Sequence, residues 1–364
     1  PEPASGWLFN SIINKHADAM DNFPELCVLP REESDQKTAQ VLGAVLPAIL
    51  EQNQFEQIYS DIWWKKLKSG TGVYGVFWDS GLAGGLGDIR IQPVDMLTLF
   101  WEPGIRDLQD SRNLFTVELV DNEVLEEQYP ALRGTLHTPS LEVGRYLYDD
   151  NVDTSEKSAV IDWYYKRGGL LHYCKYVNDT VLYASENDPL LAQIGWYSHG
   201  EYPFVTDALY PDEGTPAGFG CVDVMKDCQM YIDKLNQALM RHAMMASRKR
   251  YFIRDNGAVN EKEFADWNRD FIHVAGSGLG EDSIREVSIG TIDNVIPTML
   301  SQKIEELKET SGNRDFSQGG TNGGVTAASA IAALQETGSK LSRDMIKGSY
   351  RAFAKVGYLC IELI

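Results

Sequence analysis

Three side chains of this 364-residue chain, Asp149, Asn151 and Asp153, have the spacing of the first ligands in a calcium-binding loop. Such a loop also needs a glycine at its sixth position and a bidentate glutamate at its twelfth. Thr154 and Val160 occupy these two positions. We therefore interpret the segment as a solvated acidic turn and not as a metal site.

The remaining residue types that could do chemistry are scattered along the chain. Neither the 6 histidines nor the 5 cysteines contain a pair at metal-ligand spacing. No zinc-protease, serine-hydrolase or phosphate-loop motif occurs either. The sequence therefore predicts no metal, no cofactor and no enzyme activity. One alternative stays open, an acidic α+β hydrolase that uses carboxylates such as Asp162 or Glu305, because only folding could bring such carboxylates together.

Net charge excludes one large class of function. The chain carries a formal charge of −20, which is unfavourable for tight binding to DNA or to an anionic membrane. Residues 1–225 hold 15 Lys and Arg against 35 Asp and Glu, a net charge of −20, whereas residues 226–364 hold 18 of each. No apolar stretch is long enough to cross a bilayer, so no membrane contact is expected.

The first region reads as helices followed by short strands. Helical patterns cover Trp7–His16 and Asp35–Lys68, and Asn122–Gln128 is a short inserted helix. The alternating segment Thr71–Asp79 predicts a strand that continues through a hairpin into Asp88–Ile91. A second antiparallel set, joined by Gly-Gly and Asn-Asp turns, is predicted from three further runs: Val160–Tyr165, Leu170–Cys174 and Thr180–Tyr183.

The second region is mainly helical. A long 3.6-residue periodicity starts after Gly220 and ends near Arg248, and a second helix runs from about Pro297 to Ser311. A compact module with a short helix at Asn260–Phe271 separates the two. A glycine-rich loop and a long alanine-rich helix complete the chain. This loop lies between helices and lacks the lysine of a nucleotide-binding loop.

Two blocks in this order resemble a known family. The segment from Glu305 to Asp315, followed by Gly319–Glu336, looks like the core of tailed-bacteriophage portal proteins. Upstream, Asp212–Gly220, followed by a helix with Gln229, Asp233 and Asn236, is similar to the start of that family's first stem helix. The resemblance implies an α+β portal-protein fold with an α/β wing, a two-helix stem and a small α/β clip.

The same resemblance implies boundaries for each part. Residues 1–215 would be an acidic α+β wing, 218–248 the first stem helix, 249–290 the clip, 294–311 the second stem helix, 313–326 a tunnel loop, and 327–364 a long wing helix. The crown that follows this helix in the family is missing from the sequence, so we expect a piece of a longer protein.

Site residues follow from these assignments. The tunnel loop is expected to face DNA through nine residues: Asn313, Arg314, Gln318, Gly319, Gly320, Thr321, Asn322, Gly323 and Gly324. Contacts between neighbouring subunits in the stem and clip are expected from nine charged residues: Arg241, Arg248, Lys249, Arg250, Arg254, Glu261, Glu263, Asp266 and Asp270. The cations and the carboxylates of this second set are expected to meet across subunits.

The resemblance also implies a function and partners. Family members form rings, usually of twelve copies, at one capsid vertex, through which double-stranded DNA is packaged and ejected. The expected partners are copies of the same chain, weakly bound DNA, the terminase large subunit, a head–tail adaptor, and the major capsid and scaffolding proteins. The expected location is the virion, after assembly in the cytoplasm of a bacterial host. A different virion ring, such as a head–tail adaptor, is the nearest alternative.

Overall fold

The computed structural model describes residues 4–136, 156–247, 251–253, 260–266, 273, 284–286, 294–312 and 340–364. It divides into two compact units, and each is described by itself. The helical unit holds residues 1–8 and 225–310, and the sheet unit holds residues 9–224 and 311–364. Three of the described helices, α1, α6 and α8, begin in one unit and end in the other. Helices and strands occur together, so the expected α+β class is confirmed at that level.

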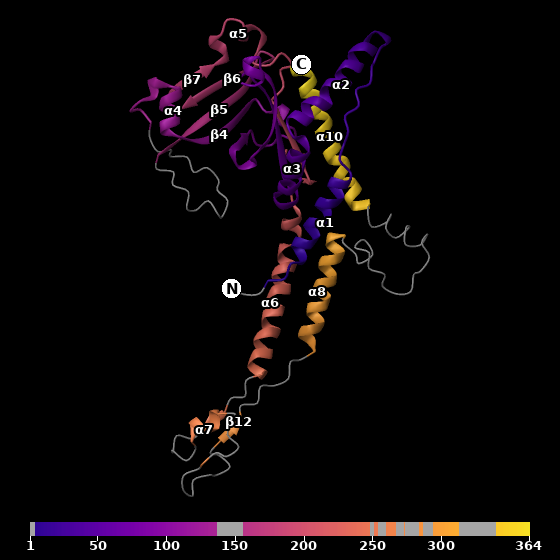
Figure 1. Cartoon of the computed structure of the whole chain (residues 1–364), viewed down its shortest axis with the longest axis vertical. Coiled ribbons are helices and arrows are strands. Elements are labelled where there is room, and N and C mark those ends of the chain that lie inside the picture. The colour runs from indigo at the N-terminus through magenta and orange to yellow at the C-terminus, as the bar shows by residue number, and fades with distance from the viewer. Residues whose placement is uncertain are drawn as a thin grey trace. The chain divides into compact units, whose positions relative to one another are not determined.

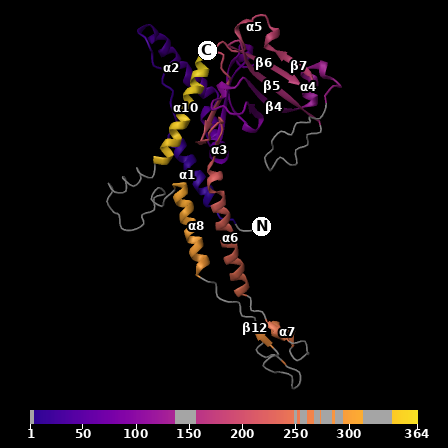
Figure 2. The ribbon, with the colours of Figure 1, turned by 180° about the vertical axis from the view of Figure 1, so that it is seen from behind.

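The helices of the sheet unit precede and follow its strands. They are α1 (Trp7–Asp21), α2 (Gln36–Gln52), α3 (Phe55–Ser69), α4 (Asn122–Gln128), α5 (Leu191–Ile194) and α10 (Lys340–Leu363). Short 3-10 helices lie at Glu33–Asp35, Ala83–Gly85, Met96–Thr98, Leu108–Asp110, Pro130–Leu132 and Ser185–Asn187. In Figures 1 and 2, α2 lies beside α10, and the two helices are in contact.

The helix expected over residues 35–68 is wrong in one respect, because the chain breaks into α2 and α3 at Asn53 and Gln54. Gln54 adopts a left-handed backbone with φ of 52°, which ends a regular α-helix. The Asn53 side chain donates to the carbonyl of Ile89 (3.0 Å) and accepts from the N–H of Ile91 (2.8 Å). These contacts with a distant strand stabilise the break, and the helical periodicity did not reveal them.

A five-stranded antiparallel sheet has the order β3-β4-β5-β6-β7 and is visible in Figure 1. Its strands are β3 (Leu99–Trp101), β4 (Asn113–Asp121), β5 (Lys157–Arg167), β6 (Leu170–Val177) and β7 (Thr180–Ala184). The two predicted tight turns are confirmed. Gly168 and Gly169 have φ of 62° and 84°, and Asn178 has φ of 50°. These left-handed values are what two-residue hairpins require.

A second, three-stranded sheet has the order β2-β1-β8. Its strands are β1 (Thr71–Asp79), β2 (Asp88–Val94) and β8 (Phe204–Ala208). The predicted hairpin between Thr71–Asp79 and Asp88–Ile91 is confirmed by the antiparallel pairing of β1 with β2. Helices α3 and α10 pack against this sheet. A short ribbon of β9 (Tyr210–Pro211) and β10 (Gly218–Phe219) follows it.

Gly70 shows how closely α3 approaches this ribbon. It ends α3 with φ of 89° and donates its N–H to the carbonyl of Lys66 (2.9 Å). A Cβ atom at this position would lie 2.3 Å from the carbonyl oxygen of Gly218. Both the left-handed conformation and this close approach therefore require glycine.

One core cluster of the sheet unit draws on both sheets and on the loops beside them. The buried side chains come from positions far apart in the sequence: Val73, Leu99, Leu108, Leu114, Tyr164, Leu171, Tyr197, Tyr202 and Phe204. Aromatic rings pack edge to face within it, with Phe204 contacting both Phe77 and Tyr164 at centroid distances of 5.5 and 5.4 Å.

The helical unit contains most of α6 (Cys221–Ser247), together with α8 (Val295–Ser311) and the short helix α7 (Glu261–Ala265). Strands β11 (Tyr251–Ile253) and β12 (Ile284–Glu286) pair antiparallel. The expected short helix at Asn260–Phe271 is shorter in the structure, ending at Ala265, and its residues from 267 to 271 lie outside the described residues.

A buried ion pair fixes α10 against the three-stranded sheet. Lys66 and Asp207 are 0% and 2% exposed, and Nζ of Lys66 lies 2.6 Å from Oδ1 of Asp207. Ser349 of α10 donates to the other carboxylate oxygen (2.6 Å) and accepts from Lys66 (2.5 Å). Burial lowers the pKa of the Lys66 ammonium, and the adjacent Asp207 carboxylate opposes this shift. The triangle therefore joins α3, β8 and α10.

Replacing Lys66 alone should lower the free energy of unfolding much more than replacing both Lys66 and Asp207. We expect Lys66→Met to lower the free energy of unfolding by about 3–5 kcal/mol, because Asp207 would be left buried without its partner. The double variant Lys66→Met with Asp207→Leu should lose clearly less, and Lys68→Met, an exposed change on the same helix, should stay within about 0.5 kcal/mol. Chemical denaturation followed by circular dichroism measures all three. Equal losses in the single and double variants would contradict this interpretation.

Candidate functional site

The nine predicted tunnel-loop residues, Asn313 to Gly324, lie outside the described residues. Of the nine predicted stem and clip residues, Arg248, Lys249, Arg250, Arg254 and Asp270 lie outside them as well. The other four are Arg241, Glu261, Glu263 and Asp266, and all belong to the helical unit. The candidate site described below therefore lies in the described helices of this unit.

Helices α6 and α8 contact each other through mixed polar and aromatic groups. The thiol of Cys228 donates to the carbonyl of Lys303 (3.2 Å), and the ammonium of Lys303 lies 5.9 Å from the ring centre of Tyr231. Leu307 of α8 is buried at 2% exposure. Lys308, one residue further along, lies over the ring of Trp7 at 5.6 Å.

The N-terminal segment of the unit is held on α6 by two polar side chains. The N–H and the hydroxyl of Ser5 both donate to Oδ1 of Asp233, at 2.8 and 2.7 Å. Gln229 accepts from the N–H of Leu8 (2.9 Å) and donates to the carbonyl of Ser5 (2.7 Å). Gln229 thus satisfies one of the unpaired N–H groups at the start of α1, a task usually done by a neighbouring capping residue.

The electrostatics of this contact favour an ionised Asp233. Burial raises the pKa of Asp233, but hydrogen bonds from Ser5 and Gln229 stabilise the carboxylate, and the net shift is downward. The sequence had singled out Gln229 and Asp233 only through the family resemblance. Their partners, Ser5 and Leu8, lie more than 220 residues away in the chain, so no local pattern could have linked them.

Exposed apolar side chains lie on more than one face of α6, and one of these faces carries two methionines. On this helix the exposed large hydrophobic residues of the helical unit are Met230, Tyr231, Met240, Met244 and Met245. Met230, Gln237 and Met244 are seven residues apart and so share one face, which also carries the predicted interface residue Arg241. The buried residues Met225, Gln229 and Ile232 lie on another face. Methionine side chains are flexible and are common on surfaces that bind other proteins.

The predicted acidic residues of the small module are partly used within the chain. Glu261 and Glu263 lie in the first turn of α7, where Asn260 is the N-cap and accepts from the N–H of Glu263. One carboxylate oxygen of Glu263 accepts from the N–H of His273 (2.7 Å) and lies 2.9 Å from its Nδ1. Glu263 is therefore engaged within its own chain, and its predicted contact with a neighbouring subunit stays a prediction.

The described residues contain no cluster of His, Cys, Asp or Glu that could hold a metal ion. Asp162, one of the two carboxylates considered for a hydrolase, accepts from the hydroxyl of Tyr173 (2.6 Å) and lies 3.8 Å from Lys175. The other, Glu305, lies 3.5 Å from Lys308 in the helical unit. Each carboxylate has its own cation within one unit. Across the described part of the chain, no helix is both long and apolar enough to span a membrane.

The Gln229 contact can be tested directly. We expect Gln229→Ala to release residues 5–8, because the N–H of Leu8 and the carbonyl of Ser5 would lose their partner. The expected cost is about 1–2 kcal/mol for this local contact. Hydrogen exchange at residues 5–8, read by mass spectrometry, should accelerate about tenfold. The matched control is Gln237→Ala on the same helix, which should leave exchange at residues 5–8 unchanged, and equal rates in both variants would refute the contact.

Comparison with known proteins gives one family. Residues 13–193 match the sequence model of the family described as phage P22-like portal protein. The match covers most of the described strands of the sheet unit, part of α1, and the whole of α2, α3 and α4. A search of curated proteins gave no match.

Proposed function

The chain belongs to the tailed-phage portal proteins, and from this membership we propose that it forms the ring through which double-stranded DNA is packaged and ejected. The match over residues 13–193 is the observation that carries the proposal. The family is structural and not enzymatic, and it implies a place at the capsid vertex of the virion. The family also implies an oligomeric ring and capsid and packaging partners in general.

Self-association is supported by the exposed face of α6. Met230, Met244 and Arg241 share this face in the single chain. Covering it with a neighbouring copy would remove the methionine side chains from water and so favour assembly. We propose the wing, stem, clip and tunnel-loop boundaries given by the resemblance, with a ring of twelve copies as is usual in the family.

Passage of DNA requires guidance without tight binding. Each phosphate neutralised by Lys or Arg strengthens binding to DNA and would oppose translocation. The proposed tunnel loop, residues 313–326, contains one cation, Arg314, and several small polar residues such as Thr321 and Asn322. These residues can make only a few weak phosphate contacts, which suits a conduit.

We further propose that the ring binds the terminase large subunit during packaging and a head–tail adaptor afterwards, and that it assembles with the major capsid and scaffolding proteins.

Ring formation gives the first test of the function. Negative-stain microscopy of the wild-type protein should show rings with a central hole, whereas a compact monomer would favour the hydrolase alternative. A ring without a stem and clip in side view would instead favour a head–tail adaptor.

Charge reversal by Arg248→Glu with Arg250→Glu should raise the concentration needed for assembly about tenfold at low salt, which corresponds to about 1.4 kcal/mol. The control Arg106→Glu with Arg133→Glu makes the same charge change in the sheet unit. An unchanged ring mass of the Arg248→Glu, Arg250→Glu variant, measured by light scattering, would contradict the proposed charge contacts.

The tunnel loop gives the second test. Deleting Gly319–Gly324 should leave ring formation intact and lower DNA packaging at least tenfold, because a shortened loop cannot follow the passing duplex. Packaging is measured as nuclease-protected DNA in the presence of the terminase. The variant Thr321→Ser, which keeps the loop length and its hydroxyl, should package normally. Full packaging by the deletion variant would refute a guiding role for the loop.

A further inference from the structure

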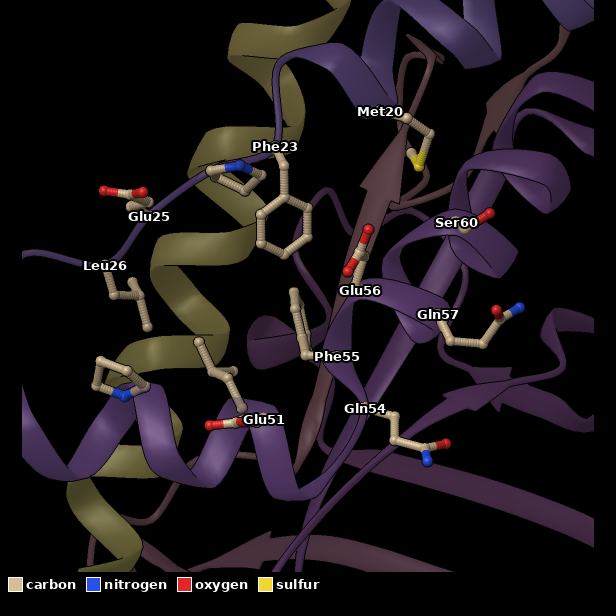
Figure 3. Close-up of a pocket in the computed structure, with 13 residues that line it drawn as sticks. Met20, Phe23, Glu25, Leu26, Glu51, Gln54, Phe55, Glu56, Gln57 and Ser60 are labelled. Carbon is tan, nitrogen blue, oxygen red and sulfur yellow. The ribbon is translucent and has the colours of Figure 1, made fainter.

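The sheet unit contains an apolar groove with a cavity volume of about 920 Å³. Its walls come from the end of α1 and the segment after it, from the end of α2 and from the start of α3 (Figure 3). Met20, Leu26, Pro47 and Leu50 contribute apolar side chains. Phe55, which is only 2% exposed, also lines the groove.

The groove is firmly held from behind by α10. The hydroxyl of Tyr350 donates to the carbonyl of Asn22 (3.0 Å). Leu26 packs so closely on Gly357 that a Cβ atom at that glycine would lie 2.8 Å from it. The ring of Phe55 contacts Phe353 at a centroid distance of 5.1 Å. A groove supported in this way is formed before any partner arrives, which lowers the entropic cost of binding.

All the charged residues that line the groove are negative. Of the 13 residues that line it, Glu25, Glu51 and Glu56 are acidic, and none is Lys, Arg or His. Among the described residues, none of these three carboxylates is within ion-pair distance of a cation. All three side chains are exposed to solvent. The groove therefore combines an apolar floor with uncompensated negative charge at its rim.

We propose that this groove binds a basic peptide segment of a second protein. One aromatic or branched aliphatic side chain of that segment enters the groove beside Phe23 and Phe55, and Lys or Arg residues flanking it pair with Glu25, Glu51 and Glu56. Charge complementarity selects this occupant, because an acidic or neutral apolar segment would leave the glutamates unpaired. The same argument disfavours the 1–225 region of a second copy, whose net charge is −20. This inference does not depend on ring formation, so failure of either proposal leaves the other standing.

Defined peptides provide the test. The probe is a fluorescein-labelled peptide, Lys-Lys-Ala-Phe-Leu-Ala-Lys-Lys, titrated with the full chain and followed by fluorescence anisotropy at low salt. Replacing Phe-Leu by Ser-Ser keeps the charge and should weaken binding at least tenfold. Replacing the four lysines by glutamates should abolish it. Equal binding of the first two peptides would show attraction to the acidic chain as a whole and would overturn the proposal.

Protein variants locate the binding on the groove. Glu51→Gln with Glu56→Gln should weaken binding of the first peptide about tenfold, whereas Glu123→Gln with Glu127→Gln, an equal charge change on α4, should not. In the variant Pro47→Trp, the larger side chain fills the groove from α2 and should block binding. Proline is unfavourable inside a helix, so its replacement should leave α2 intact. Circular dichroism checks the fold of each variant. The proposal would be overturned if the two pairs of glutamate variants bound the first peptide with equal affinity. It would also be overturned if the chain bound no peptide and instead self-associated in a way that Glu51→Gln with Glu56→Gln abolishes.

Discussion

A single buried carboxylate constrains the sheet unit. Asp207 lies at 2% exposure on β8, and an unpaired charge in such a place would be strongly destabilising. Its two oxygens are satisfied by Lys66 of α3 and Ser349 of α10. These three elements must therefore meet in one arrangement. The position of α10 in turn places Tyr350, Phe353 and Gly357 behind the acidic groove. The groove thus depends on a contact between residues 66, 207 and 349 that involves none of its lining residues.

Local patterns were enough to predict the elements whose causes are local. The alternation in Thr71–Asp79 and the Gly168-Gly169 turn each specify a strand or a hairpin without help from distant residues. The break between α2 and α3 has a different cause. Apolar periodicity continues across it, and what stabilises the break is the pairing of Asn53 with the backbone of β2. Likewise, β8 joins the sheet only by pairing with β1, more than 120 residues earlier.

Sites built from distant residues were the hardest to predict. Gln229 and Asp233 look like ordinary polar residues of an amphipathic helix until Ser5 and Leu8 are placed beside them. The groove was not predicted, because Glu25, Glu51 and Glu56 belong to three separate segments and each resembles a solvated helix or loop residue. Arg241 was predicted from the family resemblance, and in the structure it lies exposed on the long helix α6. Its assignment to a subunit interface stays a prediction.

The acidity of the chain has opposite consequences for the two classes of partner proposed for it. A net charge of −20 in residues 1–225 repels a polyanion, so the proposed channel would guide DNA without holding it. The same field attracts basic protein segments from solution and raises their rate of encounter, an effect that salt screens. Attraction alone does not select one partner, because any cation experiences it. Selection requires a place where the charge accompanies an apolar surface of defined form, and Phe23, Phe55 and the three glutamates around them combine both features. Long-range charge then sets how often a partner arrives, and the groove sets which partner stays bound.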